Sequence, residues 1–235
     1  MYKVAWIARF HPALTKEEGH RHWSEVHGPM CAAVPGLERY VQSHVVGGLP
    51  LVSGVAQEEP QFDGYSCGWW ADREAFEASM CTPEWAALVE DGHGLWDEDF
   101  LWGMSAHIGE VPQIEGERSP YKAVWIVRFR PGMSRAEGRE YWRTVHGPIF
   151  GELDINRYTQ NHVVGAIGEE GETDAQLGFD GFSECWFDDE AQLTAAVTSE
   201  AWAAANEDGP KVFDVTQLWG AVLEEQVKKD SAVPA

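Results

Sequence analysis

The spacing of hydrophobic and polar positions predicts four strands in the first half of the chain. Apolar residues occupy both faces of residues 3–10, and Pro12 ends this run, so a buried strand is expected there. Residues 38–46 and 62–70 have the length and composition of two further strands. A fourth strand is expected at about residues 99–106.

Helix-start signals lie between these strands. Thr15, followed three residues later by Glu18, forms a capping box that opens the first helix. Glycine followed by proline is a typical helix stop, so this helix is expected to end at residues 27–29. Asp72 and Thr82 are expected to cap two more helices.

The same pattern occurs a second time. Residues 2–29 and 121–148 are identical at 14 of 28 positions without a gap, and after a one-residue deletion residues 39–47 match residues 157–165. The capping box recurs at Ser134 and Glu137. Five tryptophans also recur in register, which accounts for ten of the twelve in the chain: Trp6/Trp125, Trp23/Trp142, Trp69/Trp186, Trp85/Trp202 and Trp102/Trp219.

This repeat predicts an α+β protein made of two tandem ferredoxin-like βαββαβ units. The first unit is expected at residues 1–106, a linker at 107–120, the second unit at 121–226 and a flexible tail at 227–235. A four-stranded sheet with helices on one face leaves its other face bare. We therefore expect the two bare faces to pack into one intramolecular α/β barrel, with a cavity between the sheets.

Composition limits the class of partner. A formal net charge of −22, from 17 Lys and Arg against 39 Asp and Glu, argues against nucleic acid and against anionic membranes. The four cysteines form no CxxC pair, and the first residues lack the features of a signal peptide, so a cytoplasmic protein with free thiols is expected. The expected partner is a small apolar or aromatic ligand, and the chain is expected to be an intramolecular pseudo-dimer that could also form a homodimer.

Both copies resemble the EthD family of the dimeric α+β barrel superfamily. The resemblance rests on the aromatic strand with its arginine, Trp6-Ile7-Ala8-Arg9, and on the helix end His27-Gly28-Pro29, each present again in the second copy. A Phe-Asp-Gly turn followed by an acid and an aromatic pair appears at residues 179–187. The family normally builds its barrel from two chains, so the tandem chain implies an internal barrel. Cys67 of the first copy stands where the second copy has Glu184.

The resemblance implies a loosely defined activity, because the superfamily holds cofactor-free isomerases, cyclases, lyases and monooxygenases as well as haem-handling members. We expect a cofactor-independent enzyme that moves protons on a small apolar carbonyl or aromatic compound. The alternatives are a cofactor-free or haem-linked monooxygenase and a hydrophobic ligand-binding module without turnover. No recognised metal-ligand spacing occurs in the sequence, so no metal site is expected.

The second predicted strand of each copy carries the clearest candidate chemistry. Tyr40, Gln42 and His44 are spaced by two and share one face of the strand. Tyr158, Gln160 and His162 repeat this arrangement. If this face lines the cavity between the sheets, the histidines are candidate general bases and the tyrosines candidate oxyanion donors. A solvated polar face or a structural hydrogen-bond role is the alternative.

Further candidates lie at the helix ends and on the third strand. His27 and His146 follow the first helices, where a histidine can belong to the site or bind the free carbonyls of the helix end. A buried Glu184 is expected to have a raised pKa and to serve as an acid or base. Cys67 is expected to be inert unless its pKa is lowered, since no cationic residue is obviously near.

Substrate-binding candidates are arginines and aromatic residues. Arg9 and Arg128 could anchor a carboxylate or carbonyl, or could pair with an internal acid. The tryptophans are expected to be mainly core, with some lining a cavity for flat or apolar ligands. The full set of expected ligand contacts is Trp6, Arg9, Gln42, Cys67, Trp69, Trp125, Arg128, Gln160 and Trp186.

Overall fold

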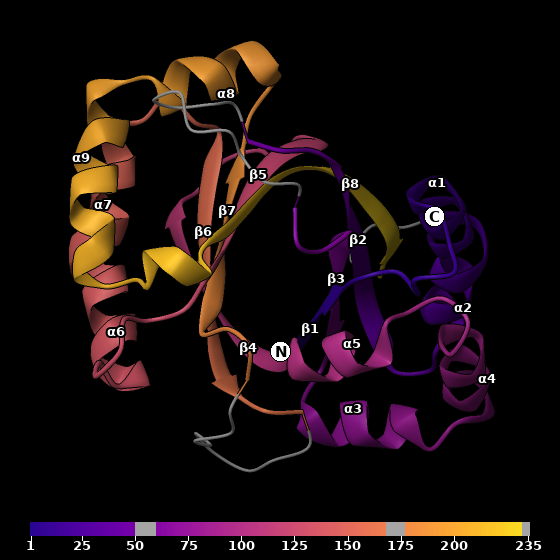
Figure 1. Ribbon diagram of the computed structural model, residues 1–235. Coiled ribbons are helices and arrows are strands. Elements are labelled where there is room, and N and C mark those ends of the chain that lie inside the picture. Colours follow the sequence, from indigo (N-terminus) through magenta and orange to yellow (C-terminus); the bar gives the residue numbers. More distant parts are fainter. Residues whose placement is uncertain (50–59, 168–176, 232–235) are drawn as a thin grey trace.

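A computed structural model describes residues 1–49, 60–167 and 177–231. Its strands close into one antiparallel barrel in the order β1-β3-β2-β8-β5-β7-β6-β4 (Figure 1). The prediction of an α+β protein with an internal barrel is confirmed. The strands are β1 (Tyr2–Ala8), β2 (Leu37–Gly47), β3 (Gly64–Trp70), β4 (Ser105–Ile114), β5 (Tyr121–Val127), β6 (Arg157–Gly165), β7 (Gly181–Trp186) and β8 (Trp219–Asp230).

Each half contributes a four-stranded sheet, and the last strand of each half closes the barrel against the other half. β8 pairs with β2 of the first half, where Gln226 lies opposite Gln42. β4 pairs with β6 of the second half, where Val111 lies opposite Gln160. These two long strands join the halves edge to edge, so that the closed sheet has no free edge.

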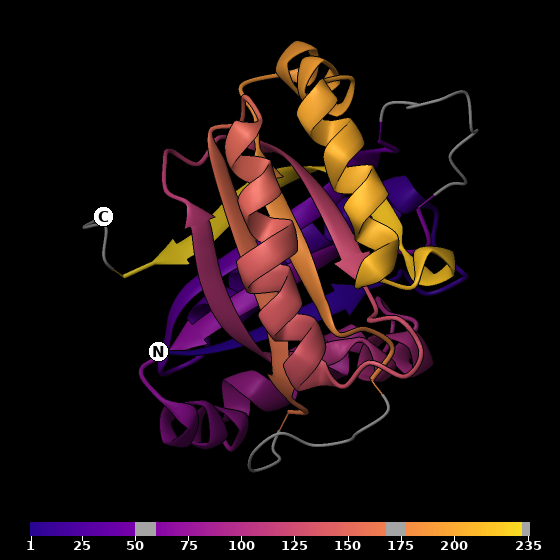
Figure 2. The same cartoon turned by 90° about the vertical axis from the view of Figure 1, so that its left-hand side faces the viewer.

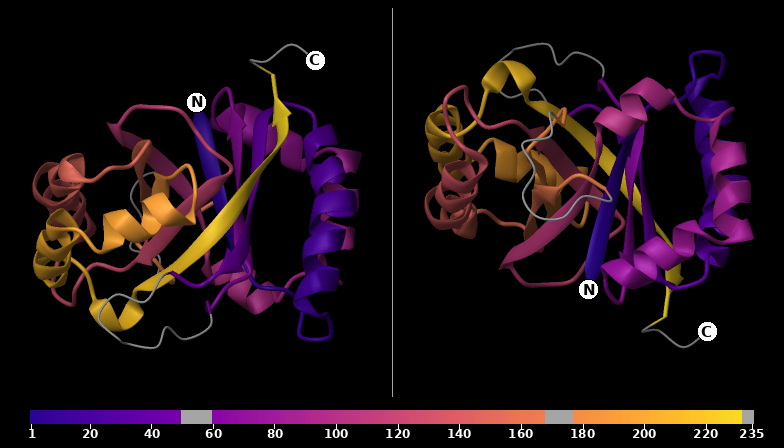
Figure 3. Two further views of the ribbon diagram at one scale, coloured as in Figure 1. Left: turned by 90° about the horizontal axis from the view of Figure 1, so that it is seen from above. Right: turned by 90° about the horizontal axis from the view of Figure 1, so that it is seen from below.

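The helices form two layers outside the barrel, one for each half, and the views in Figures 2 and 3 place these layers on opposite sides. Of the helices in the described ranges, none is long and apolar enough to cross a bilayer. The α-helices are α1 (Lys16–His22), α2 (Gly28–Ala33), α3 (Arg73–Met80), α4 (Pro83–Gly92), α5 (Glu98–Gly103), α6 (Arg135–Tyr141), α7 (Gly147–Ile149), α8 (Glu190–Val197) and α9 (Glu200–Asp208). Single π-helical turns follow α1 and α6, at η1 (Trp23–His27) and η2 (Trp142–His146), and 3₁₀ turns lie at η3 (Phe150–Glu152), η4 (Gly209–Lys211) and η5 (Val215–Gln217).

The predicted helix starts are confirmed, but the first helix does not stop where expected. Thr15 and Glu18 form the capping box, and Asp72 and Thr82 cap α3 and α4. The chain continues from η1 directly into α2, because Pro29 lies in the first turn of α2, where its missing N–H costs no hydrogen bond. The π turn and the following helix place His27 inside a continuous helical segment.

Two strand predictions are also corrected. Residues 98–103 form α5 instead of a strand, and β4 begins at Ser105 and extends to Ile114, through much of the expected linker. β8 extends to Asp230, through four residues of the expected tail, while residues 232–235 lie outside the described residues. Both extensions have the same cause, since each strand gains backbone hydrogen bonds by pairing with the other half of the barrel.

The barrel interior is filled, which contradicts the expected cavity between the sheets. Apolar side chains from both halves, among them Ile7, Val41, Val124, Ile126 and Phe182, form a single core there. A group of ionised side chains lies beside this core, and the free space among them is about 10 Å³. That volume is at the lower limit for one water molecule, so the interior does not admit a substrate.

Candidate active site

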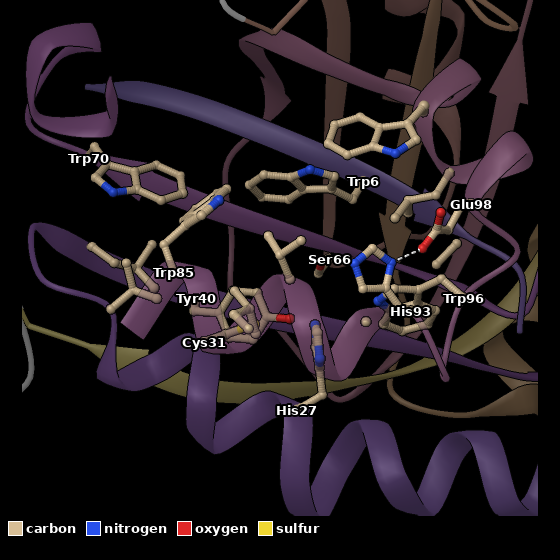
Figure 4. A pocket seen from close by; sticks show the side chains of 18 residues that line it. Trp6, His27, Cys31, Tyr40, Ser66, Trp70, Trp85, His93, Trp96 and Glu98 are labelled. Carbon is tan, nitrogen blue, oxygen red and sulfur yellow. Dashed lines mark hydrogen bonds and ion pairs between the residues drawn. The ribbon is translucent and has the colours of Figure 1, made fainter. Parts of the chain in front are cut away.

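A pocket of about 130 Å³ lies in the first half, between the outer face of the sheet and its helices (Figure 4). Its walls are mostly apolar and aromatic, with a few polar groups directed into it, as in many small-molecule sites. The strands contribute Trp6, Tyr40, Ser66 and Trp70, and the segments outside the sheet contribute His27, Cys31, Trp85, Leu88, His93, Trp96, Glu98 and Trp102.

His27 brings a neutral imidazole to this pocket. Its side chain is buried, with 6% of the residue exposed, and Nδ1 lies 2.8 Å from Oδ2 of Asp91 in α4. Because a carboxylate accepts hydrogen bonds, Nδ1 carries the proton and Nε2 keeps its lone pair. Burial lowers the pKa of His27, while the bond to Asp91 opposes this effect. The residue is therefore uncharged near neutral pH and can accept a proton at Nε2.

Asp91 is held by a second histidine. Nε2 of His22 lies 2.9 Å from Oδ1 of Asp91, and the His22 side chain is 40% exposed. The pKa of Asp91 is lowered by the hydrogen bonds from His27 and His22, against the opposing effect of burial. The ionised carboxylate fixes the tautomer of His27 and stabilises the imidazolium that forms when His27 takes a proton.

Tyr40 supplies a neutral hydroxyl to the same pocket. Its side chain is buried, and Nε2 of Gln42 lies 3.4 Å from its hydroxyl. Burial raises the pKa of Tyr40 well above its usual value, and the neighbouring Cys31 raises it further. A phenol that stays protonated in an apolar pocket is suited to donate a hydrogen bond to a substrate oxygen that becomes negatively charged. Figure 4 shows Tyr40 and His27 directed into the pocket from the sheet and from the helical segment.

The pocket mouth has a different character. His93 bonds to Glu98, and this interaction raises the pKa of the exposed His93. Trp102 in α5 also lines the pocket mouth, and 62% of its surface is exposed. An exposed indole next to an ion pair gives the entrance one apolar edge and one polar edge.

The structure corrects the environment predicted for the strand-two histidines. Tyr40, Gln42 and His44 face the helices, while Val41 and Ser43 face the barrel interior. Nδ1 of His44 lies 2.8 Å from Nδ1 of His20, and Nε2 lies 3.1 Å from Oε1 of Gln42. Burial lowers the pKa of His44 to about 3. Of these three side chains only Tyr40 lines the pocket, and His44 belongs to the packing between β2 and α1.

The equivalent residues of the second half are placed in the same way. Nε2 of His162 lies 2.9 Å from Oε1 of Gln160, and burial lowers the pKa of His162 to about 4. The amide of Gln160 donates to the carbonyl of Trp142 at 2.9 Å, as Gln42 does to Trp23 in the first half. The two glutamines therefore hold the π turns on the sheet.

Glu184 lies in the barrel interior, and its predicted raised pKa is wrong. Nζ of Lys122 donates to it at 2.8 Å, Asn161 donates at 2.9 Å, and Tyr65 also donates to it. Burial would raise the pKa of Glu184, but Lys122 and Lys3 hold it far below the usual range. A carboxylate paired in this way stays ionised and is a structural anchor between the halves.

Cys67, Trp69 and Trp186 also lie outside the pocket. Burial raises the pKa of Cys67 to about 12, although Lys3 and Lys122 lie near enough to oppose this, contrary to the expectation of no nearby cation. The Cys67 thiol is therefore protonated and weakly nucleophilic, as expected for a packing residue. The ring of Trp69 packs under Nζ of Lys3, and that of Trp186 under Nζ of Lys122.

The two arginines do not reach the pocket. Arg9 pairs with Asp97 at 2.7 Å on the surface, which corresponds to the acid-pairing alternative, and Arg128 is exposed. Trp6 lines the pocket, whereas Trp125 packs in the core of the second half.

Sequence reasoning missed Asp91, Cys31, Trp85 and Trp96 as site residues. Asp91 could have been found from the repeat, because an aspartate, Asp208, occupies the matching position of the second copy. There Nδ1 of His146 lies 3.0 Å from Oδ2 of Asp208. In place of His22, the second half has Tyr141, whose hydroxyl donates to Asp208 at 2.8 Å.

Comparison with known proteins matches residues 11–99 and 130–216 to the EthD domain family. A search of the curated proteins finds no match. An anthrone oxidase-like protein has a similar solved structure, with a TM-score of 0.61, 13% identity, and coverage of 100% of this chain and 95% of that chain.

Two further solved structures are described as candidate monooxygenases. That from Fusobacterium nucleatum subsp. nucleatum ATCC 25586 has a TM-score of 0.59 and 9% identity, and covers 97% of this chain and 94% of its own. That from Lactobacillus acidophilus NCFM has a TM-score of 0.52 and 10% identity, and covers 98% and 95%. At such low identity these likenesses establish the fold alone.

Proposed function

The chain belongs to the EthD family, and we propose that its first half is a cofactor-independent enzyme that transfers a proton on a small uncharged carbonyl or aromatic compound. The observation that carries the proposal is the pairing of a buried neutral His27, oriented by Asp91 at 2.8 Å, with a buried Tyr40 in one tryptophan-lined pocket. His27 and Tyr40 replace the strand-two histidines as the groups that do the chemistry.

The reaction begins when Nε2 of His27 removes a proton from a carbon that is next to a carbonyl or conjugated with a carbonyl through a ring. The electron pair of the broken C–H bond moves to the substrate oxygen, which becomes an enolate or phenolate. The Tyr40 hydroxyl donates a hydrogen bond to that oxygen, and Asp91 stabilises the new imidazolium of His27. Return of the proton to another carbon completes an isomerisation, and loss of a leaving group completes an elimination.

2-Indanone, an uncharged compound with one aromatic ring and two acidic CH₂ groups beside a carbonyl, is a suitable test substrate for a pocket of about 130 Å³. Wild-type protein under argon in D₂O should accelerate exchange of the CH₂ protons, followed by NMR. His27→Gln keeps a donor for Asp91 but has no basic nitrogen, so the exchange rate should fall by about 10²- to 10⁴-fold. His146→Gln, the matched change in the second half, should leave the rate within twofold of wild type. Equal rates for wild type and His27→Gln would refute the role of His27.

A second candidate function is cofactor-free oxygenation, which the names of the fold neighbours favour. The same deprotonation gives a carbanion that can pass electrons to O₂. One oxygen atom then forms a new carbonyl at the former CH₂ carbon, and the other leaves as water with its two hydrogens, so no outside reductant is needed. Oxygen uptake with 2-indanone in air separates this function from proton transfer alone.

A haem-linked reaction does not suit this pocket. A porphyrin ring is larger than the free space of about 130 Å³ between the tryptophan walls. The other remaining function is ligand binding without turnover, which would give bound ligand with neither proton exchange nor oxygen uptake.

A further inference from the structure

One difference between the two halves lies close to the matching His-Asp pairs. Two residues after the His-Gly-Pro motif, the first half has Cys31 and the second half has Phe150. Cys31 lines the first-half pocket. Phe150 is buried in the second half, with 5% of its surface exposed.

The Phe150 ring contacts a defined set of neighbours. It stacks on Tyr158 with ring centroids 4.5 Å apart and planes at 20°. It meets the rings of His146 and Trp202 edge-on, at 5.5 and 5.9 Å. Aromatic pairs prefer these stacked and edge-on geometries.

These three neighbours are the counterparts of residues that line the first-half pocket. Tyr158 corresponds to Tyr40, His146 to His27 and Trp202 to Trp85. In the first half the small Cys31 thiol leaves the space that the Phe150 ring fills in the second. Figure 4 shows Cys31 next to Tyr40, and we call the part of the pocket lined by Cys31, Tyr40 and His27 its inner end.

The size and charge of the space agree with an uncharged aromatic ring. The pocket holds about 130 Å³, and a dry apolar cavity of about 150 Å³ in a protein core is known to take up benzene. His27 and Tyr40 are both neutral near pH 7, because burial lowers the pKa of His27 and raises that of Tyr40. A charged ring would lose its hydration without gaining an opposite charge at this end.

We propose that the inner end of the first-half pocket binds one uncharged aromatic ring, stacked on Tyr40 with its edge toward His27 and Trp85, in the pose that Phe150 holds in the second half. The second half is occupied by its own side chain, so the chain binds one such ligand. This proposal deepens the proposed function, on which it rests for its catalytic use, by naming the part of the substrate that enters the site.

The test uses 4-fluorophenol as a single-ring probe, with binding followed by ¹⁹F NMR titration. Wild-type protein should bind one probe per chain. Cys31→Phe should place a ring in the pocket and weaken probe binding at least tenfold. Cys81→Phe, the same substitution at the exposed cysteine, should bind as wild type does. Unchanged binding by folded Cys31→Phe would overturn the proposal.

The reciprocal change tests the second half and does not depend on the folding of Cys31→Phe. Phe150→Cys should open the matching space, so the number of bound probes should rise from one to two. A second variant, Phe150→Ala, should give the same gain if the cysteine variant does not fold. A single bound probe in a folded variant of Phe150 would overturn the assignment of its ring as the occupant.

Probe binding and catalysis fail separately in these experiments. Substitutions at residues 31 and 150 report on probe binding, whereas His27→Gln reports on proton exchange. If probe binding changes as expected with the substitutions at residues 31 and 150, but the wild-type protein exchanges no protons, the proposed function is overturned and the proposed binding site for an aromatic ring is supported. If proton exchange depends on His27, but probe binding is unchanged by the substitutions at residues 31 and 150, only the proposed binding site for an aromatic ring is overturned.

Discussion

The barrel interior and the helix-covered layer of the first half both bury ionisable side chains, and they differ in what those side chains contact. In the barrel interior, Lys122 donates to Glu184 at 2.8 Å and to Glu225 at 2.7 Å, and Lys3 donates to Glu110 at 2.9 Å. In the layer between the first sheet and its helices, His27 and Tyr40 face a pocket of about 130 Å³. In the barrel interior the charged groups are paired and almost no free space adjoins them. In the layer between the sheet and the helices, polar groups adjoin a pocket.

The difference separates structural burial from functional burial. A charged group that is fully paired resists any change of protonation, as the far lowered pKa of Glu184 illustrates. A neutral group that is oriented by one partner and faces an open space can still exchange a proton with a ligand. Burial and an altered pKa occur in both regions, so the free volume beside the group is the better guide to the active site.

The largest expected effect lies in the barrel interior. Glu184→Ala removes one of the two carboxylates that pair with the buried Lys122, and it leaves the buried donors of Tyr65 and Asn161 without their acceptor, so the free energy of unfolding should fall by about 3–5 kcal/mol. Guanidinium denaturation followed by tryptophan fluorescence measures this change. Glu224→Ala, at an exposed glutamate close by in β8, should change stability by no more than about 0.5 kcal/mol. A loss below about 1 kcal/mol for Glu184→Ala would show that the network contributes little to stability.

A smaller effect for each residue, about 2 kcal/mol between pH 6.5 and 5, is expected from His44 and His162 as structural residues. Their folded-state pKa values of about 3 and about 4 lie below the unfolded value, so acid protonates the unfolded chain first. Stability is therefore complete above about pH 6.5 and falls as the pH drops toward these values, by roughly 1.4 kcal/mol per pH unit for each histidine. Urea denaturation between pH 7 and 5 measures the slope. The double variant His44→Gln and His162→Gln should flatten it and keep the proton-exchange rate per folded molecule.

The smallest expected effect concerns His22. His22→Tyr copies Tyr141, which keeps a hydrogen bond to its aspartate in the second half. The change removes the imidazole whose charge lowers the pKa of His27. The pKa of His27 should therefore rise, and the acid limb of the kcat/KM profile should move to higher pH, with a maximal rate within a fewfold of wild type. A shift to lower pH, or loss of the maximal rate, would contradict this role.

Much of the fold was predictable because its signals are local. The duplicated motifs, the capping boxes at Thr15 and Ser134 and the caps at Asp72 and Thr82 depend on residues a few positions apart. The fourth strand was misplaced because residues 98–103 follow a capping aspartate at Asp97 into α5. The extension of β4 and β8 depends on partners in the other half, which no local pattern specifies.

The candidate site was predictable only in part. His27, Tyr40 and Trp6 were singled out and line the pocket, whereas Asp91 was not, although it lies only 2.8 Å from His27. Residue parity grouped Tyr40 with His44 correctly but could not say which face of β2 meets the helices. Both faces of this strand are largely buried, so the sequence lacks the polar stripe that identifies a solvent-facing side.

The sequence by itself determined that the chain folds as two copies of one unit, because duplicated caps, strand lengths and aromatic positions specify the same local structure twice. Only the tertiary structure decided which copy holds the pocket. The two halves share the histidine, the aspartate and the tyrosine, and free volume depends on how side chains from separate elements fill a common space. Cys31 and Phe150 occupy matching positions of the repeat, and both count as apolar in the sequence pattern. The small thiol of Cys31 leaves room for a ligand in the first half, whereas the ring of Phe150 fills the matching space in the second half.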